Sequence, residues 1–377
     1  MALFCCFIEL SEFFRERVRR KAFKNLSTNQ NMLDKKKIDS VISGYKNFKI
    51  ATICSHSSLQ IFKGAREEGI KTIGIVQKDK RKLYESFPLG RPDEFIEVDS
   101  YEDIPYDELV DESAIIIPHG SFVEYVGKKF DDIPVPIYGN RMSIVWERSR
   151  EKMYEWLSKS GIKTPKIYQP DEIDGPAMVK FPGAKGGRGY IIVSSEEEFR
   201  KKVGDKECVI QEFIVGVRAY PHYFFSPFNK QGYLTKQGRI EMLGVDRRVE
   251  SSADEIARAI CLGIDLDLAF TVIGNEPLVL RESLLSEYME IGRKVSEKSF
   301  ELYGGLFGPY CIETIITENL EIIAFEVSAR IVAGTNVFPE GSPYSAYYYK
   351  EQMSMGRRIA KELKVAAKLK KLKQVLY

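Results

Sequence analysis

The sequence predicts an α/β protein of two or three domains, and three observations support this. The chain has 377 residues, and a domain takes roughly 100–200 of them. From Phe48 to about residue 140, short runs of Ile and Val alternate with amphipathic helical patterns, which is typical of βαβ units around a parallel sheet. After residue 165, two short strands joined by a glycine-rich loop and followed by a third strand predict a smaller α/β lobe.

The composition excludes several classes of protein. Lys and Arg number 56 against 54 Asp and Glu, so the net charge is +2, and such a mixed surface argues against a dedicated nucleic-acid binder or a disordered scaffold. No stretch reaches the roughly 20 apolar residues of a membrane-spanning helix. The six cysteines form no CxxC pair, which supports neither a zinc site nor a disulfide framework and fits a reducing cytoplasm. We expect a cytoplasmic protein that binds neither nucleic acid nor membrane.

Residues 1–31 differ from the rest of the chain. An apolar start is followed by a basic block at residues 15–24 and a polar stretch at residues 25–31. The apolar run is too short for a membrane span, and its basic residues follow it instead of preceding it as in a signal peptide. We interpret these residues as an appended segment or as a start codon placed too early. An arm used in subunit contacts is the alternative.

The first domain is expected to carry polar turns where its strands end. The predicted strands are residues 49–54, 72–76, 95–98 and 114–117. Ligands of open α/β sheets bind at the carboxyl ends of the strands. His56 follows the first strand, and His119, Gly120 and Ser121 follow the fourth; each turn precedes a predicted helix, whose free N–H groups bind anions. Histidines that serve only as turn residues remain the alternative.

The rest of the chain is predicted from the same patterns. A charged helix is expected over residues 143–159, ended by Gly161 with Pro165 just beyond. Strands at 177–181, 190–193 and 208–214, with a helix from about Glu196, follow; then come strands near 241–249 and 270–273, a helix at 284–303, a hairpin at 310–327 and a terminal helix. The Lys-rich residues 361–373 keep apolar residues at helical spacing, which favours a solvated helix face over a site for an anionic partner.

The glycine-rich loop at residues 181–190 predicts a phosphate site. Glycines let backbone N–H groups wrap phosphate oxygens, and cations neutralise the charge. Lys180 on the preceding strand can reach a further phosphate. The loop matches neither the Walker nor the dinucleotide pattern, and a plain hairpin loop and a lysine without a role are the alternatives. The loop glycines are Gly183, Gly186, Gly187 and Gly189, and its cations are Lys185 and Arg188.

The late hairpin predicts a pair of carboxylates. With a turn near Asn319, Glu313 and Glu326 lie opposite each other on one face, where Cβ atoms are about 4.5–5.5 Å apart and two carboxylates repel. A positive ion is expected between them, and Mg²⁺, which binds a few carboxylates together with nucleotide phosphates, is the natural candidate. Asn336 can complete the cluster through its amide oxygen. The alternative is that both glutamates face solvent.

Two further features fit a nucleotide. The strand that runs into Gly216 is a candidate hinge whose backbone meets an adenine edge. Glu250 can accept hydrogen bonds from a ribose, and an ion pair with Arg247 or Arg248 is the alternative. We identify no Ser–His–Asp or Cys–His arrangement. The combination of cationic loop, hinge and paired glutamates suggests phosphoryl transfer by positioning and charge neutralisation.

In this order the motifs resemble those of the ATP-grasp ligases, and more closely those of the archaeal formate-dependent synthetases of formaminoimidazole-carboxamide ribonucleotide, the PurP family. The resemblance covers about residues 32–365. The segments that carry it are 55–59 (SHSSL), 118–122 (PHGSF), 138–141 (YGNR), 179–190 (VKFPGAKGGRGY), 273–275 (IGN), 281–285 (RESLL), 325–330 (FEVSAR) and 334–336 (GTN).

The resemblance implies an ATP-grasp fold, at residues 142–377 with a small nucleotide lobe at about 165–216, preceded by an open parallel-sheet substrate domain at 32–141. It implies that ATP phosphorylates formate, and that the 5-amino group of aminoimidazole-carboxamide ribonucleotide (AICAR) attacks the formyl phosphate, in purine biosynthesis. It also implies a homo-oligomer. By motif, the ribonucleotide would bind His56, Ser121 and Asn275; ATP would bind Lys180, Gly183, Lys185, Gly186, Gly187, Arg188, Gly189, Gln211, Glu212, Phe213, Ile214 and Glu250; Mg²⁺ or Mn²⁺ would bind Glu313 and Glu326.

The chain departs from the family pattern at two places. Gln211 stands where the family often has an acidic residue, and Val332 and Ala333 stand where the family has Asp-Gly before Gly-Thr-Asn. Two alternatives stay open at this point. One is a related ATP-grasp ligase that uses another small carboxylate or another amine, and the other is a nucleotide-binding paralogue without catalysis.

Overall fold

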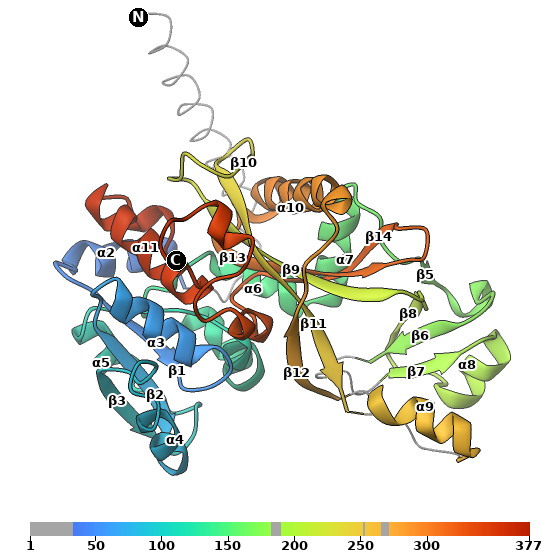
Figure 1. Cartoon of the computed structure of the whole chain (residues 1–377). Helices are drawn as coiled ribbons and strands as arrows, with labels where there is room; N and C mark the ends of the chain where they lie inside the picture. Colours follow the sequence, from blue (N-terminus) through green and yellow to red (C-terminus); the bar gives the residue numbers. More distant parts are fainter. Residues whose placement is uncertain (1–32, 182–189, 252, 265–270) are drawn as a thin grey trace, which may run out of the picture.

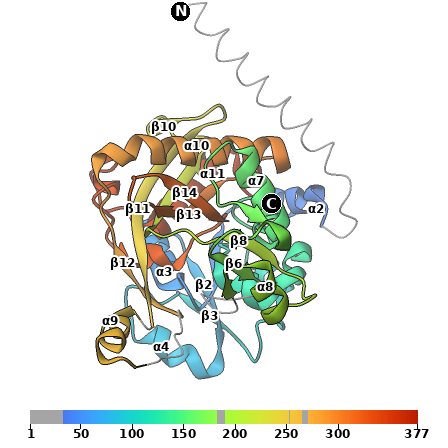
Figure 2. The ribbon, with the colours of Figure 1, turned by 90° about the vertical axis from the view of Figure 1, so that its right-hand side faces the viewer.

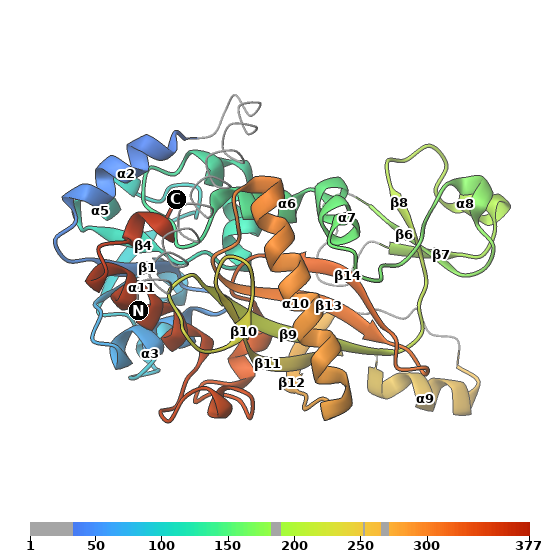
Figure 3. The same cartoon turned by 90° about the horizontal axis from the view of Figure 1, so that it is seen from above.

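The computed structural model describes residues 33–181, 190–251, 253–264 and 271–377. Its elements form an N-terminal α/β part, a central antiparallel sheet and a small lobe, arranged side by side in this order (Figures 1 and 3). The predicted α/β class is therefore confirmed. None of the helices in the described ranges is long and apolar enough to cross a membrane.

The N-terminal sheet is parallel throughout, as predicted. Its strands are β1 (Lys49–Ile53), β2 (Thr72–Gln77), β3 (Glu94–Val98) and β4 (Ala114–Ile116), in the order β3-β2-β1-β4. Strands β1, β2 and β4 are almost wholly buried, because helices cover both faces of such a sheet. The helices of this part are α2 (Lys35–Gly44), α3 (Ser58–Glu67), α4 (Arg81–Glu85) and α5 (Tyr106–Asp111), with a short 3-10 turn, η1 (Lys78–Lys80).

Two helix predictions need correction. The helix expected after β4 is a π-helical turn, η2 (Phe122–Val126), followed by a 3-10 helix, η3 (Gly127–Asp132). The single helix expected at 143–159 is two helices, α6 (Arg141–Arg148) and α7 (Arg150–Lys159). Ser149 separates them because its backbone is extended and its side chain caps α7 by accepting from the Lys152 N–H. The predicted end is confirmed, since Gly161 has φ +65°.

The small lobe is a four-stranded antiparallel sheet with one covering helix. Strands β5 (Ile167–Tyr168), β6 (Ala177–Lys180), β7 (Tyr190–Val193) and β8 (Val209–Glu212) lie in the order β5-β8-β6-β7, with η4 (Pro170–Glu172) and α8 (Glu196–Lys202) beside them. Val179, Val193 and Phe199 form its core with Ile210. The predicted strands are confirmed, with the last ending two residues earlier than expected. The loop residues 182–189, which include all the glycines and cations assigned to the phosphate site except Lys180, lie outside the described residues.

The central sheet holds six strands, and α10 (Glu282–Tyr303) lies across one face of it (Figure 2). The order is β10-β11-β9-β13-β14, and β12 pairs with β11. The expected hairpin is β13 and β14, but β9 and α9 (Ala253–Leu262) were not predicted. The strands are β9 (Val217–Ser226), β10 (Tyr233–Leu234), β11 (Arg239–Glu250), β12 (Val272–Pro277), β13 (Gly308–Ile316) and β14 (Ile322–Ser328).

The C-terminal segment returns to the N-terminal sheet. It contains η5 (Ala333–Val337), η6 (Ser345–Tyr347), α11 (Met355–Lys368) and η7 (Leu372–Gln374), and α11 packs on α3 (Figure 1). The two helices approach closely through glycines. A Cβ on Gly64 would lie 2.1 Å from the backbone nitrogen of Arg357, and a Cβ on Gly356 would lie 2.1 Å from the backbone oxygen of Gln60. The proposed boundaries at residues 32–141 and 142–377 stay predictions.

Candidate functional site

The two glutamates of the late hairpin lie opposite each other. Glu313 on β13 pairs with Glu326 on β14, as the spacing predicted. Glu313 is buried and Glu326 is half-buried, so the alternative in which both face solvent is wrong. Burial, and after it the negative charge of Glu313, together raise the pKa of Glu326 to about 7. The site therefore favours a positive charge beside this pair.

Two cations of the chain itself lie at the carboxylates. Arg248 on β11 forms an ion pair with Glu313, and its guanidinium lies 4.2 Å from the centre of the Tyr220 ring. Lys180 lies 5.4 Å from the Phe325 ring centre, and its charge acts against the rise in the pKa of Glu326. The sequence analysis gave Arg248 no role beside Glu313 and Glu326. The alternation of Asp246, Arg248 and Glu250 along one strand was the signal that could have found it.

Lys180 belongs to a small hydrogen-bonded group. Its Nζ donates to Gln211 Oε1 at 2.8 Å, and the Tyr154 hydroxyl donates to the same oxygen at 2.6 Å. Gln211 is buried on β8, the strand next to β6. Burial lowers the pKa of Lys180, and the nearby Glu326 acts in the opposite direction. The structure thus brings together the strand lysine, the first hinge residue and the carboxylate pair.

The remaining hinge residues lie at the rim of the small lobe. The Glu212 carboxylate accepts from the Lys166 N–H at 3.0 Å, and Phe213 donates its N–H to Pro176 O at 3.1 Å. Phe213 is exposed and Ile214 half-buried. Gly216 passes close to β13, because a Cβ there would lie 2.3 Å from Ile316 O.

Glu250 forms an ion pair with Arg218 on β9. The alternative that named Arg247 or Arg248 as its partner is wrong. Arg247 pairs with Glu276 at 2.7 Å, and Arg248 pairs with Glu313. A half-buried tyrosine, Tyr190, begins β7 near this pair, since the charges of Arg218 and Glu250 both act on its hydroxyl. Glu250 therefore lies beside the end of the glycine-rich loop.

The two turn histidines of the N-terminal sheet are in contact. Their rings stack with centroids 5.2 Å apart and planes 4° apart. His119 Nε2 lies 2.9 Å from Ile53 O, so this nitrogen carries the proton and donates. Its Nδ1 accepts from the N–H of Ser121 at 3.3 Å. Burial lowers the pKa of His119 to about 3, so the ring is neutral.

His56 is held in an unusual backbone conformation. Its φ is +54°, and its Nδ1 lies 2.7 Å from the Ser57 hydroxyl. A Cβ on Gly120 would lie 2.7 Å from His56 Nε2, so only glycine leaves room for this ring. Burial lowers the pKa of His56, and His119, Arg330 and Arg248 lower it further.

Asn336 does not complete the carboxylate pair. Its Oδ1 accepts from Gln60 Nε2 at 2.7 Å, and its Nδ2 donates to His56 O at 2.8 Å. The expectation of a metal-binding amide is therefore wrong, because both ends of this amide are used at the His56 turn. Asn336 supports the backbone of that turn.

Asn275 on β12 is linked to a buried acid. Its Nδ2 donates to Asp246 Oδ2 at 2.7 Å, and the other oxygen of Asp246 lies 2.8 Å from His222 Nε2. Asp246 and His222 are both buried, each 1% exposed. The amide nitrogen of Asn275 is thus occupied, which orients its Oδ1 away from Asp246. The third histidine of the chain, which no sequence motif singled out, supports this arrangement.

These groups form one polar cluster, which we call the polar centre. It runs from Lys180 through the carboxylate pair and Arg248 to His56, because Arg248 pairs with Glu313 and its charge also acts on His56. Arg330, which the sequence reasoning assigned no role, lies beyond and pairs with the buried Glu147 at 3.0 Å. Within the described part of the chain, no group of three or more His, Cys, Asp or Glu residues can hold a metal ion.

Comparisons with known proteins cover most of the chain. A family described as "Protein of unknown function (DUF1246)" matches residues 50–168, and "Domain of unknown function (DUF1297)" matches residues 195–377. A protein of Methanococcoides burtonii is 50% identical to this chain, and one of Korarchaeum cryptofilum is 48% identical. Each match covers 92% of this chain and the full length of the relative. Both are named 5-formaminoimidazole-4-carboxamide-1-(beta)-D-ribofuranosyl 5'-monophosphate synthetase.

Solved structures show the same fold. The crystal structure of an IMP biosynthesis protein PurP from Thermococcus kodakaraensis is 30% identical, with a TM-score of 0.69, and the match covers 87% of this chain and all of that one. Biotin carboxylase from Campylobacter jejuni is similar in fold alone, at 15% identity and a TM-score of 0.59, over 83% of this chain and 70% of that one. The predicted ATP-grasp fold with a preceding α/β part is confirmed by these neighbours.

Proposed function

Because the chain belongs to the family of 5-formaminoimidazole-4-carboxamide-1-(beta)-D-ribofuranosyl 5'-monophosphate synthetases, we propose that it uses ATP to join formate to the 5-amino group of AICAR. It is then an ATP-dependent carbon–nitrogen ligase of purine biosynthesis. The observation that carries the proposal is the continuity of the polar centre, in which Arg248 contacts Glu313 and acts on His56. A phosphorylated carboxylate formed at one end is thereby close to an amine held at the other.

ATP binds at the small lobe in this proposal. Lys180 supplies a cation for its phosphates, residues 211–214 face the adenine and Glu250 the ribose. The cations and glycines of residues 182–189 are assigned to the phosphates by motif. The hydrogen bond from Lys180 to Gln211 supports the assignment, because it fixes the lysine beside the strand that precedes the hinge.

Glu313 and Glu326 fit a divalent cation. Two opposed carboxylates, one with its pKa raised to about 7, form an oxygen donor set whose mutual repulsion a cation relieves. With only two acidic ligands, the remaining coordination falls to phosphate oxygens and water. When bound, Mg²⁺ or Mn²⁺ neutralises phosphate charge. The choice between the two metals stays part of the proposal.

The ribonucleotide binds at the histidine turns and β12. His56 and Ser121 lie at the carboxyl ends of β1 and β4, where open α/β sheets bind ligands. Asn275 presents its amide oxygen, because Asp246 holds the amide nitrogen. The neutral His119 positions both neighbours, since its ring stacks on His56 and its Nδ1 accepts from Ser121.

The reaction proceeds in two steps on these groups. A formate oxygen attacks the γ-phosphorus of ATP and ADP leaves, which gives formyl phosphate. The 5-amino nitrogen of AICAR then attacks the formyl carbon, loses a proton and displaces phosphate. Lys180 and Arg248 stabilise the anionic phosphoryl oxygens by their fixed positive charges, and the Glu313 and Tyr220 contacts hold Arg248 in place.

The test is ADP release by the purified protein with Mg²⁺ and ATP, with and without AICAR and formate, alongside mass detection of the product. We expect release that needs both substrates and a product one formyl group heavier than AICAR. ADP release that depends on a different carboxylate or amine would replace formate or AICAR in the proposal. Nucleotide binding without turnover would contradict catalysis. A cytoplasmic location and a homo-oligomeric state stay predictions.

A further inference from the structure

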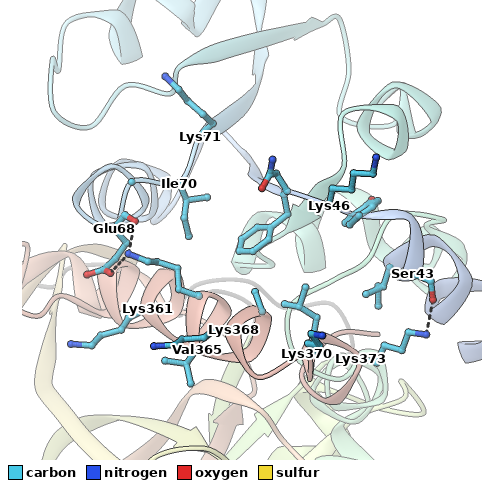
Figure 4. Close-up of a pocket in the computed structure, with 18 residues that line it drawn as sticks. Ser43, Lys46, Glu68, Ile70, Lys71, Lys361, Val365, Lys368, Lys370 and Lys373 are labelled. Carbon is cyan, nitrogen blue, oxygen red and sulfur yellow. Dashed lines mark hydrogen bonds and ion pairs between the residues drawn. The ribbon is translucent and has the colours of Figure 1, made fainter.

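The buried acid Asp246 differs from the charged groups at the surface of the fold. Beside α11, for example, Lys364 pairs with Glu68 at 3.1 Å and stays about half exposed to solvent (Figure 4). The side chain of Asp246 is only 1% exposed. A carboxylate is stable in such a place where hydrogen bonds and charge partners compensate its loss of water. The partners of Asp246 therefore indicate its role.

Asp246 lies on β11 between the two residues that contact it. On β9, Tyr220 stands opposite Asp246, and His222 is the next residue on the same face. On β12, Asn275 stands opposite Arg248, which is the next residue of β11 on the face of Asp246. Each partner thus reaches Asp246 along a diagonal of the sheet, a separation that long side chains can span.

Both oxygens of Asp246 face a donor. Asn275 Nδ2 donates to Oδ2 at 2.7 Å. His222 Nε2 lies 2.8 Å from Oδ1, and this nitrogen carries a proton because two acceptor atoms would repel at that distance. The His222 ring is 1% exposed, and its Nδ1 has no hydrogen-bond partner among the residues that the structure describes. His222 therefore serves to hold Asp246.

The carboxylate of Asp246 sets the orientation of the Asn275 amide. A carboxylate has no donor, whereas an amide in its place would offer an NH₂ group to one of the two partners. Asn275 therefore turns its nitrogen toward Asp246 and its Oδ1 away. Asp246 cannot swing aside, because the η5 turn closes over it: a Cβ on Gly334 would lie 2.2 Å from Asp246 Oδ1.

The oxygen of Asn275 lies at the phosphoryl end of the polar centre. Arg248, directly opposite Asn275, forms the ion pair with Glu313. No hydrogen bond to Asn275 Oδ1 is found within the described ranges. In the proposed function, on which this inference rests, formyl phosphate forms beside Arg248 and the 5-amino group of AICAR attacks it. An acceptor at this position therefore meets the reacting amine.

We propose that Asp246, held by His222, is a positioning residue that fixes Asn275 as the hydrogen-bond acceptor for the 5-amino group of AICAR. Because this amine is conjugated with the imidazole, its N–H bonds lie in the ring plane and its lone pair stands perpendicular to them. An acceptor for one N–H fixes the direction from which the lone pair attacks the formyl carbon. The same arrangement selects a ribonucleotide that has a donor at this position.

The test measures AICAR binding to the full chain by titration calorimetry without ATP or metal, so it does not depend on turnover. Asp246→Asn keeps the size of the side chain but adds a donor, which reverses the Asn275 amide. The matched control is Asp79→Asn, with the same change in charge at an exposed acid. We expect the control to bind AICAR like the wild type, and Asp246→Asn to bind it about tenfold more weakly.

An exchange of the two side chains separates this role from a purely structural one. Asp246→Asn/Asn275→Asp keeps the net charge and again turns an acceptor toward the ligand, so it should recover most of the affinity. A second comparison uses His222: His222→Gln keeps an N–H donor for Asp246 and should bind AICAR like the wild type, whereas His222→Leu should bind it more weakly. Urea unfolding of each variant checks the fold.

Two analogues identify the donor. The ribonucleotide that lacks the 5-amino group should bind the wild type about tenfold more weakly than AICAR does, and Asp246→Asn should no longer distinguish the two. The change in affinity on removing the 2′-hydroxyl of AICAR should be the same in both proteins.

Three results would overturn the proposal. One is equal affinity of the wild type and Asp246→Asn for AICAR. Another is an exchange variant that is as stable as the wild type and does not regain affinity, because the buried group is then structural only. The third is a loss of discrimination for the 2′-hydroxyl instead of the amine, which would place Asn275 at the ribose. Failure of AICAR to bind the wild type is a different result, which would contradict the proposed function itself and this inference with it.

Discussion

The neutral state of His119 predicts a measurable pH dependence of stability. The ring is fully buried, and its pKa falls to about 3 because burial disfavours its charged form and Arg330 adds repulsion. In the unfolded chain the pKa returns to its ordinary value of 6.5. Since the folded state binds the proton less well, the contribution of His119 is complete above pH 6.5 and is lost as the pH falls toward 3.

The size of this effect follows from the two pKa values. Each unit of difference between the folded and unfolded pKa corresponds to about 1.4 kcal/mol. Between pH 7 and pH 5, protonation of His119 in the unfolded chain lowers the free energy of unfolding by about 2 kcal/mol. His119→Gln removes the titration and keeps an N–H donor for Ile53 O. The decrease in the free energy of unfolding from pH 7 to pH 5 should therefore be about 2 kcal/mol smaller in the variant than in the wild type.

The assay is equilibrium urea unfolding of both proteins at the two pH values, followed by circular dichroism. Titrating groups other than His119 cancel in the comparison of the two decreases. The chain has three histidines, so a ring-carbon NMR titration of the native protein checks the protonation directly. Equal decreases in both proteins, or a His119 signal that titrates near its ordinary pKa, would refute the reasoning.

Three further predictions concern the polar centre. Glu326→Gln should lower Mg²⁺-dependent ADP release by a factor on the order of 100, because the variant removes a metal ligand. The urea midpoint at pH 7 should stay unchanged or rise, because the variant also removes the repulsion between Glu326 and Glu313. Unchanged ADP release would contradict the metal assignment. Asn275→Ala should raise the KM for AICAR about tenfold and leave the KM for ATP unchanged in steady-state assays, because one hydrogen bond to the ribonucleotide is lost; a change in the KM for ATP alone would place Asn275 at the other substrate. Gly334→Ala should lower the free energy of unfolding by about 1–3 kcal/mol in urea unfolding, because its Cβ would lie 2.2 Å from Asp246 Oδ1. Gly44→Ala is the control and should not be destabilised, because no atom lies within 4 Å of its Cβ. Equal stability of the two variants would contradict the clash at Gly334.

The parts that sequence predicted best depend on local patterns. The parallel strands follow from buried Ile and Val runs, because strand side chains alternate with a period of two. The opposition of Glu313 and Glu326 was predicted from the turn position, but it depends on a β-bulge between Glu313 and Thr314 that the sequence did not reveal. Without this bulge, the register next to the turn would place Glu313 opposite Phe325. Strand β9 was missed because Pro221 interrupts its pattern, and proline normally excludes a central strand. The sheet tolerates it there because the pairing of β9 with β13 skips Tyr220 and Pro221.

Contacts between distant segments could not be predicted in this way. The partner of Arg248 depends on how β11 lies across β9 from β13, and its spacing from Glu250 suggested the wrong pair. The same limit applies to Arg330 and Glu147, which meet only because β14 packs beside α6. Ion pairs between distant segments can be predicted only once the topology is known, whereas ion pairs along one helix or hairpin can be predicted from the sequence spacing.

The turn at His56 shows how strongly its conformation depends on the distant C-terminal segment. His56 has the φ of +54° that side chains other than glycine rarely adopt, and Asn336, 280 positions later, donates to its carbonyl oxygen. Gln60, one turn further along α3, donates to both Thr335 and Asn336 and accepts from the Gly356 N–H. The N-terminal sheet therefore owes the geometry of its His56 turn to residues of the C-terminal segment. This arrangement gives a physical reason for both parts to remain in one chain, because the conformation of His56 depends on contacts that either part alone would lack.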